Sequence, residues 1–192
     1  MRSKHHELYV PAADGPAALD ELDRVPWADL DHAYGTGKLG PELYEDVAAT
    51  LRRFGDSLPG AFEAAVHALF SNLCHQGTIY ESTAFAIPFL AAFAAGTDLS
   101  PNQVLTFGAI FVSIGIAASF EAPNGSRAGS YGPGVAPLTR EAFRASRDLL
   151  TQAAQRNPKL HEVTVALAAL VRTDTPDQAA VERLGALLND EG

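Results

Sequence analysis

The sequence has only one cysteine, Cys74, and few of the β-branched runs that are typical of strands. A single cysteine excludes an internal disulfide bond. A catalytic thiol would need an exposed position and a lowered pKa, and the adjacent His75 would point in a different direction on a helix. We therefore expect Cys74 to be a small buried residue.

Positive charge is also scarce, because 14 lysines and arginines stand against 23 aspartates and glutamates, for a formal net charge of −9. A surface of this sign repels phosphate backbones, which argues against a nucleic-acid partner. It would attract a basic protein and speed the encounter. Plain solubility is the simpler role of the same charge.

We expect neither a signal peptide nor a membrane span. The N-terminal residues 1–7 are polar, with no apolar segment after them. The most apolar run, 104–120, has a borderline length for a membrane span. Gly108, Ser113 and Gly115 interrupt it, and neither basic residues nor tryptophan flank it. A helix covered by its neighbours explains this run better, and we expect a cytoplasmic protein with no membrane partner.

Helical periodicity is what the sequence does contain. Apolar residues recur at the i, i+3, i+4 spacing from Leu39 onward. Ser100-Pro101-Asn102-Gln103 has the N-cap, the proline and the glutamine of a capping box. Pro88 should kink or split its helix near Ile87. The pattern predicts helices over residues 39–54, 58–73, 79–95, 102–120, 138–155, 160–172 and 177–188.

Pairs of these helices recur at about forty residues, the period of HEAT-type hairpins. We therefore predict a single all-α domain, a short α-solenoid of HEAT-like antiparallel helical hairpins, in which each hairpin covers the apolar face of its neighbour. We expect Trp27 and Leu30 to pack against the first hairpin. The predicted units are an irregular N-terminal cap (1–37) with a short helix near residues 16–22, hairpins (38–76, 78–120 and 138–173), a Gly/Pro-rich loop (121–137) and a C-terminal cap helix (176–189).

A polar stretch, residues 74–83, lies between two apolar helical patterns. Gly77 can end the first helix, and Thr78 can cap the second. A partly positive His75 imidazole and the Glu81 carboxylate suit the helix dipoles at these two ends. A structural role at a joint between helices therefore accounts for the residue types in this stretch.

Two elements of the sequence carry a resemblance. One is His32-Ala33-Tyr34-Gly35, preceded by Trp27, and the other is His75-Gln76-Gly77-Thr78-Ile79-Tyr80-Glu81, which leads into Pro88-Phe89-Leu90. Over residues 27–90 the chain resembles a group of bacterial HEAT-repeat-like proteins with these elements. The resemblance implies an α-solenoid and favours an immunity or adaptor role, and it implies no established activity.

The candidate binding residues are His32, Tyr34, His75, Gln76, Tyr80 and Glu81. A metal or acid/base site built from His32, His75 and Glu81 is the chemical alternative. However, the sequence has no His-Glu-x-x-His motif, and His67 lies two helical turns from His75, too far for one ion. We therefore predict no catalytic residue, no metal site and no cofactor.

A group of acidic residues precedes the first predicted hairpin. Such a run is usually a solvated face, and it can also dock a basic protein. Its members are Asp14, Asp20, Glu21, Asp23, Asp29 and Asp31.

Three functions remain open. The first is a non-catalytic protein-binding module that acts by occlusion, such as an immunity or adaptor protein for a basic partner. The second is a hydrolase that uses His75 as a base, with Glu81 or His32 as its partner. The third is a small-ligand sensor in which the loop 122–136 closes over a pocket between helices.

Overall fold

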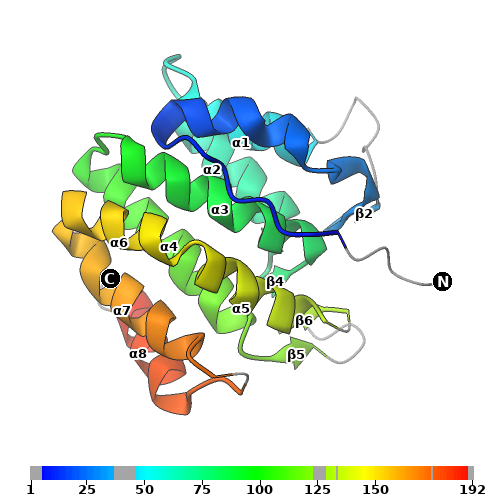
Figure 1. Cartoon of the computed structure of the whole chain (residues 1–192), viewed down its shortest axis with the longest axis vertical. Coiled ribbons are helices and arrows are strands. Elements are labelled where there is room, and N and C mark those ends of the chain that lie inside the picture. The colour runs from blue at the N-terminus through cyan, green and yellow to red at the C-terminus, as the bar shows by residue number, and fades with distance from the viewer. Residues whose placement is uncertain (1–5, 37–45, 123–128, 133, 174, 190–192) are drawn as a thin grey trace.

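The computed structural model describes residues 6–36, 46–122, 129–132, 134–173 and 175–189, which form a mostly helical fold with small sheets at one end (Figure 1). The α-helices are α1 (Val47–Arg52), α2 (Ala61–Asn72), α3 (Glu81–Gly96), α4 (Pro101–Ala117), α5 (Val135–Ala145), α6 (Arg147–Arg156), α7 (His161–Leu170) and α8 (Gln178–Asn189). The 3₁₀ helices are η1 (Gly15–Arg24), η2 (Trp27–Asp29), η3 (Arg53–Gly55) and η4 (Pro158–Leu160). The strands are β1 (Asp31–His32), β2 (Gly35–Thr36), β3 (Cys74–His75), β4 (Thr78–Ile79), β5 (Glu121–Ala122) and β6 (Gly129–Tyr131).

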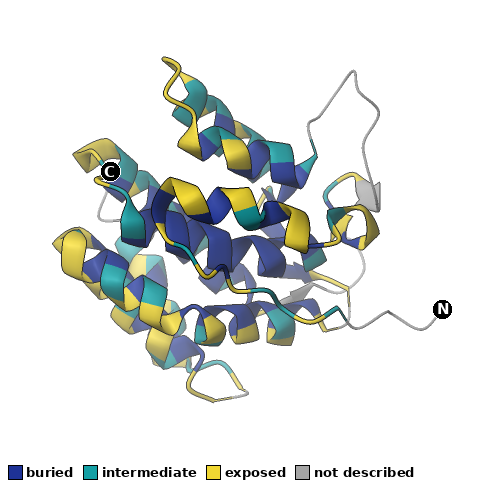
Figure 2. Ribbon diagram, turned by 45° about the horizontal axis from the view of Figure 1, so that its top comes forward, coloured by how far each residue is buried: buried dark blue, intermediate teal, exposed yellow. Residues whose placement is uncertain are grey.

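The helix α3 is enclosed by its neighbours. Every residue from Ser82 to Ala95 is buried, and Figure 2 shows buried helix at the centre of the fold. A helix that is apolar all round needs cover on all sides, and α3 packs against η1, α5 and α6. The predicted split near Ile87 does not occur, because α3 continues through Pro88 as one helix. Packing on all sides outweighs the hydrogen bond that proline cannot donate.

The expected solenoid is not confirmed, although the helical content is. In a solenoid each unit contacts only its neighbours in sequence. Here α3 packs against η1 from before it and against α5 and α6 from after it. The Gln152 side chain also donates a hydrogen bond to the Asp14 carboxylate at 2.8 Å. At the end of α3 the backbones touch, since a Cβ atom on Gly96 would lie only 2.2 Å from the Gly15 nitrogen.

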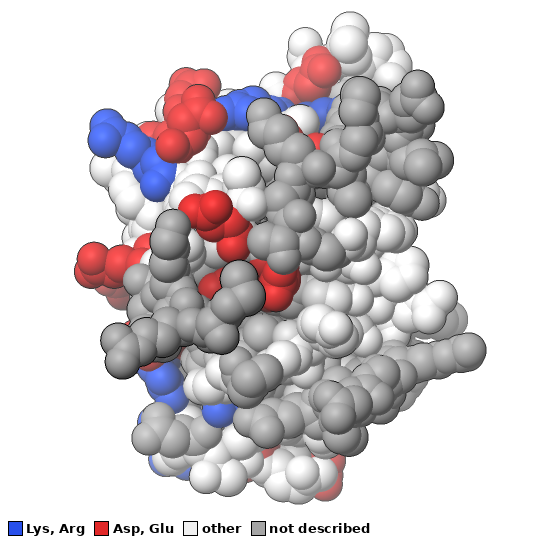
Figure 3. All heavy atoms as spheres, turned by 90° about the vertical axis from the view of Figure 1, so that its right-hand side faces the viewer, with Lys and Arg blue, Asp and Glu red and all other residues white. Residues whose placement is uncertain are grey.

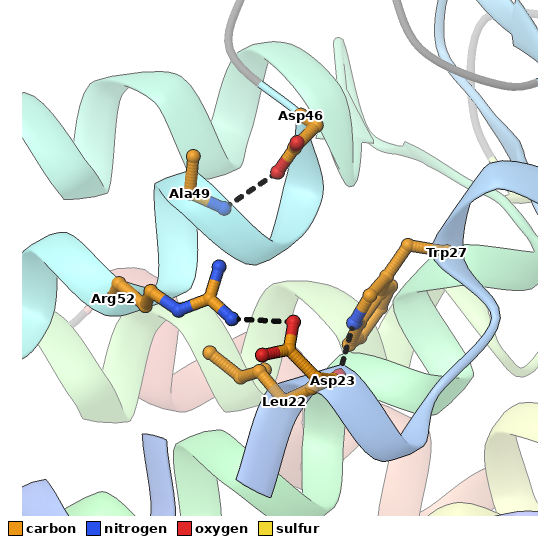
Figure 4. A network of polar contacts seen from close by, with 6 residues as sticks. All are labelled: Leu22, Asp23, Trp27, Asp46, Ala49 and Arg52. Carbon is orange, nitrogen blue, oxygen red and sulfur yellow. Dashed lines mark hydrogen bonds and ion pairs between the residues drawn. The ribbon is translucent and has the colours of Figure 1, made fainter. Parts of the chain in front are cut away.

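The short helix expected near residues 16–22 is present as η1. The Trp27 indole N–H donates to the Leu22 carbonyl at 2.8 Å (Figure 4). The Trp27 ring packs on Phe89 of α3, with 6.1 Å between ring centroids. Trp27 therefore anchors the N-terminal segment to the central helix, which belongs to the second predicted hairpin.

The predicted start of α4 is confirmed. The Gln103 amide donates to the Ser100 hydroxyl at 3.4 Å, and the Ser100 amide donates to the Gln103 side chain at 2.9 Å. The helix is less covered than expected, because Leu105 is exposed, and α3 takes the enclosed place instead. No helix in the described segments has both the length and the apolar character needed to cross a lipid bilayer.

The sheets correct the expectation of an all-α chain. One sheet has the strand order β3-β4-β6-β5, with β3 antiparallel to β4 and with β6 parallel to both β4 and β5. The other pairs β1 with β2. The stretch 121–137, predicted as a loop, supplies β5, β6 and the start of α5, while residues 123–128 and 133 lie outside the described part. Ser130 joins β6 to α4, because its hydroxyl donates a hydrogen bond to the Ala117 carbonyl at 3.1 Å.

Candidate functional site

The predicted joint between helices is a β-hairpin. His75 pairs with Thr78 across β3 and β4, and Gln76-Gly77 form the two-residue turn between them. Both turn residues have left-handed backbones, with φ of 52° at Gln76 and 80° at Gly77, as a type I′ turn requires. The expectation that Gly77 ends a helix and that Thr78 caps the next one is therefore wrong.

Thr83 holds together the two helix ends that flank this hairpin. Its hydroxyl accepts a hydrogen bond from the Tyr80 amide at 3.0 Å and donates one to the Leu73 carbonyl at 2.5 Å. Thr83 thus caps the start of α3 and binds the residue that follows α2. This role was not predicted from the sequence, although the spacing of three residues from the N-cap position is that of a capping box.

Three of the six candidate residues meet in space. The Tyr34 ring lies 5.8 Å from the His75 ring, centroid to centroid, and the Tyr34 amide donates to His32 Nδ1 at 3.3 Å. The Ala33 amide donates to the carbonyl of Asn72 at 3.0 Å, which fixes the turn between β1 and β2 to the end of α2. The His32 side chain is buried and Tyr34 is exposed. The two sequence elements that carry the resemblance are therefore in contact.

The other three candidates lie apart from this cluster. Gln76 is exposed at the tip of the hairpin. Tyr80 packs on Tyr131 of β6, with 5.6 Å between centroids, and burial together with the nearby Cys74 and Tyr131 raises its pKa. Glu81 is half-buried in the first turn of α3.

At the hairpin end, which comprises β1 to β4 and the start of α3, the described residues do not assemble the acid/base pair considered for His75. In the described segments Glu81 makes no hydrogen bond or ion pair with His32 or His75, and no group of three or more His, Cys, Asp or Glu side chains is arranged to hold a metal ion. Cys74 is buried as predicted. Burial raises the pKa of its thiol to about 11, so the thiol stays protonated near neutral pH and is a weak nucleophile.

The acidic residues before α1 are mostly engaged within the chain. The Glu21 carboxylate accepts hydrogen bonds from the Tyr9 hydroxyl and from the amides of Ala12 and Ala13, and these bonds lower its pKa. Asp23 forms an ion pair with Arg52 at 2.7 Å (Figure 4). Seen from the hairpin end, acidic side chains form several separate groups on the surface (Figure 3). These carboxylates fasten the N-terminal segment more than they form a single docking patch.

A groove that was not predicted from the sequence lies between α5, α6 and α7. Its volume is about 920 Å³. The buried side chains of Phe143, Leu150 and Leu167 contribute to its apolar floor, and Val165 is 42% exposed along it. Polar side chains that line it include those of Arg144, Arg147, Arg172, Gln155 and His161.

Three arginines gather at one end of this groove. The Arg144 side chain donates to the carbonyls of Val171, at 2.6 Å, and Thr173, at 3.3 Å, and it pairs with Glu141 at 2.8 Å. These bonds bring the end of α5 against the end of α7. Arg147 begins α6 close by in sequence, and Arg172 lies two residues after the end of α7.

Comparison with known protein families, with curated proteins and with solved structures finds no match for this chain. Two surfaces of the molecule, the hairpin end and the groove, therefore bear on its function.

Proposed function

We propose that the chain is a non-catalytic protein-binding module and that the groove between α5, α6 and α7 holds its partner. The observation that carries the proposal is an apolar concavity of about 920 Å³ with guanidinium groups beside it. Binding sites combine an apolar surface with a few polar groups that fix orientation. Grooves between helices commonly take the apolar face of a partner helix.

The hairpin end supports the non-catalytic part of the proposal. Acid/base catalysis needs a base within hydrogen-bond reach of its partner group, and among the described residues no hydrogen bond or ion pair joins Glu81 to His75. Nucleophilic catalysis needs an activated thiol or hydroxyl, and the Cys74 thiol has a raised pKa. The polar residues here serve turns and helix ends instead.

An immunity or adaptor protein acts in this way, since it covers the surface of a partner and performs no chemistry. The basic partner expected from the net charge gains little support, because Asp14, Glu21 and Asp23 are bound within the chain. The ligand-sensor alternative expects residues 122–136 to close over a pocket, but the described residues of this stretch line no part of the groove.

The groove can be filled without disturbing the core. Ala168 is an exposed residue of α7 that lines the groove, and Ala179 is an exposed residue of α8 that does not. We expect tagged wild-type protein and Ala179→Trp to capture the same partner from the producing cells. Ala168→Trp should recover at least about tenfold less, a loss of about 1.4 kcal/mol in binding, by quantitative mass spectrometry.

Unchanged thermal unfolding of both variants is the control for folding. Equal recovery of every captured protein by wild type, Ala168→Trp and Ala179→Trp would show that the groove is not the binding surface.

A further inference from the structure

The groove is chemically asymmetric along its length. Arg144, Arg147 and Arg172 lie at the end where α6 begins and α7 finishes, whereas Gln155 and His161 lie where α6 finishes and α7 begins. The helices α6 and α7 contact each other and are joined only by residue 157 and η4. Such a short connection makes neighbouring helices antiparallel. The cationic end and the neutral end are therefore at opposite ends of one groove.

From this asymmetry we propose that the groove takes an amphipathic α-helix of a partner protein, with the acidic C-terminal turn of that helix over the arginine end. This inference depends on the proposed function and adds the chemistry and direction of the bound segment.

The availability of the charge at this end supports an acidic occupant. The Arg147 side chain is exposed and makes no hydrogen bond or ion pair with the residues that the structure describes. Arg172 is 3.8 Å from Asp177, a long ion pair with a largely exposed guanidinium. Arg144 is held by backbone carbonyls and by the Glu141 carboxylate, so its position is set before a partner arrives, and the available charge comes from Arg147 and Arg172. Carboxylates form their strongest hydrogen bonds with such guanidinium groups.

The shape of the floor supports a helical occupant. Arg172, two residues after the end of α7, lines the groove together with Val165 and Ala168, which follow the spacing of one helix face on α7. On α6, Arg147, Leu150 and Ala154 do the same. Each row carries small or apolar residues and has its arginine at the same end. A third helix can pack its apolar stripe between two such rows.

The direction follows from the helix dipole. The C-terminal end of a helix carries partial negative charge and has carbonyl groups without intrahelical partners. Acidic side chains are unfavourable at that end in isolation, and the arginines would supply the missing positive charge. An acyl chain with a carboxylate has similar charge, but the open groove exposes Val165 and would leave one side of such a chain in water.

Three labelled peptides of equal composition in their apolar stripe test this inference by fluorescence anisotropy. Each has fourteen residues with leucine at helical spacing, and they differ in carrying three glutamates in the last turn, three glutamates in the first turn, or glutamines at all of these positions. We expect the peptide with C-terminal glutamates to bind at least about tenfold tighter than the other two. Its affinity should fall as salt concentration rises.

Charge reversal on α6 provides the matched variants. Arg147→Glu should weaken binding of the C-terminally acidic peptide at least about tenfold. Arg156→Glu reverses a charge on the same helix outside the groove lining and should change the affinity less than twofold. Equal affinity for the three peptides, no measurable binding at millimolar concentration, or no effect of Arg147→Glu would overturn the inference.

Two outcomes separate this inference from the function on which it depends. If Ala168→Trp abolishes partner capture while the peptides show no charge preference, the groove remains the binding surface and the acidic helix is wrong. If sodium laurate binds the groove and the acidic peptide does not displace it, the site is one for acyl chains and the inference also fails.

Discussion

The hairpin end and the groove use their polar side chains in opposite ways. At the hairpin end, polar groups bind the fold itself, as when Thr83 bonds to both Tyr80 and Leu73. At the groove, the exposed Arg147 side chain makes no hydrogen bond or ion pair with the described residues. The hairpin end has the conspicuous sequence motif, and the groove has none.

An unusual local sequence can therefore reflect what folding requires. A type I′ turn, a helix start and a contact between distant backbone segments each demand particular residue types. A binding surface on regular helices makes no such local demand, because its residues occupy ordinary helical positions. The following experiments compare the two regions directly.

The largest difference should be in thiol reactivity. Cys74 is the sole native cysteine and its thiol has a pKa of about 11, whereas Ala168→Cys would place a second thiol in the groove. At pH 8 an ordinary thiol is roughly one-quarter thiolate and a thiol of pKa 11 about one part in a thousand. Alkylation by iodoacetamide, followed by mass spectrometry, should be more than about 100-fold slower at Cys74.

The pH dependence of Cys74 alkylation has a definite sign. Because the thiolate fraction rises tenfold per pH unit below the pKa, the rate should rise about tenfold between pH 8 and pH 9. Equal rates at Cys74 and at the groove thiol would show that the hairpin end is as open as the groove.

A threonine-to-valine substitution should change stability by different amounts at the hairpin end and in the groove, and this difference is smaller than the one in thiol reactivity. Thr83→Val leaves the buried Tyr80 amide without its acceptor, and we expect a loss of about 2 kcal/mol in the free energy of unfolding. Thr151 lines the groove, is exposed, and bonds only within its helix, to the Arg147 carbonyl at 2.9 Å. Thr151→Val should change stability by less than about 0.5 kcal/mol. Urea unfolding measures both, and similar losses would remove the contrast.

The smallest expected effect is a change in stability of opposite sign when glutamine is replaced by asparagine in the two regions. Gln76 has a left-handed backbone that asparagine adopts at lower cost, so Gln76→Asn should stabilise the protein by about 0.5 kcal/mol. Gln155 is an exposed helical residue of the groove, and Gln155→Asn should destabilise by about 0.3 kcal/mol because asparagine is the poorer helix former. Thermal unfolding of the pair checks the signs, and destabilisation by both would argue against the turn geometry.

Much of the helical framework could be predicted from the sequence because its signals are local. The capping box at Ser100 is a contact between neighbouring residues, and the short helix near residues 16–22 follows from local pattern. The break at Ser146 could not be predicted, since the apolar pattern continues from α5 into α6. Which helices pack around α3 could not be predicted either, because they come from distant parts of the chain and helical periodicity describes only neighbouring residues.

The sheet could not be predicted because its strands are two or three residues long. Strands this short show no alternation, and the parallel partner of β4 comes from a Gly/Pro-rich stretch that otherwise reads as loop. The same glycine, Gly77, fits a helix end and a two-residue turn equally well. The structure distinguishes the turn from the helix end, because the turn is supported by the pairing of Thr78 with Gly129.

The candidate site was partly predictable. The meeting of Tyr34 with His75 joins two elements that the sequence singles out, whereas the groove depends on how α6 and α7 pack. One signal was available for the groove: α7 is apolar beyond the width of a single face, with Val165 and Ala168 in addition to its buried residues. Apolar residues beyond what the core can cover indicate an exposed surface.

The enclosed α3 has a consequence for assembly of the chain. No group of helices on one side of it suffices to shield it, because η1 comes before it and α5 and α6 come after. A polypeptide cut between α4 and α5 should therefore give two pieces that remain unstructured when separate and recover the native spectrum when mixed. Backbone amides in the middle of α3 should be the last in the molecule to exchange with deuterium, at a rate set by complete unfolding.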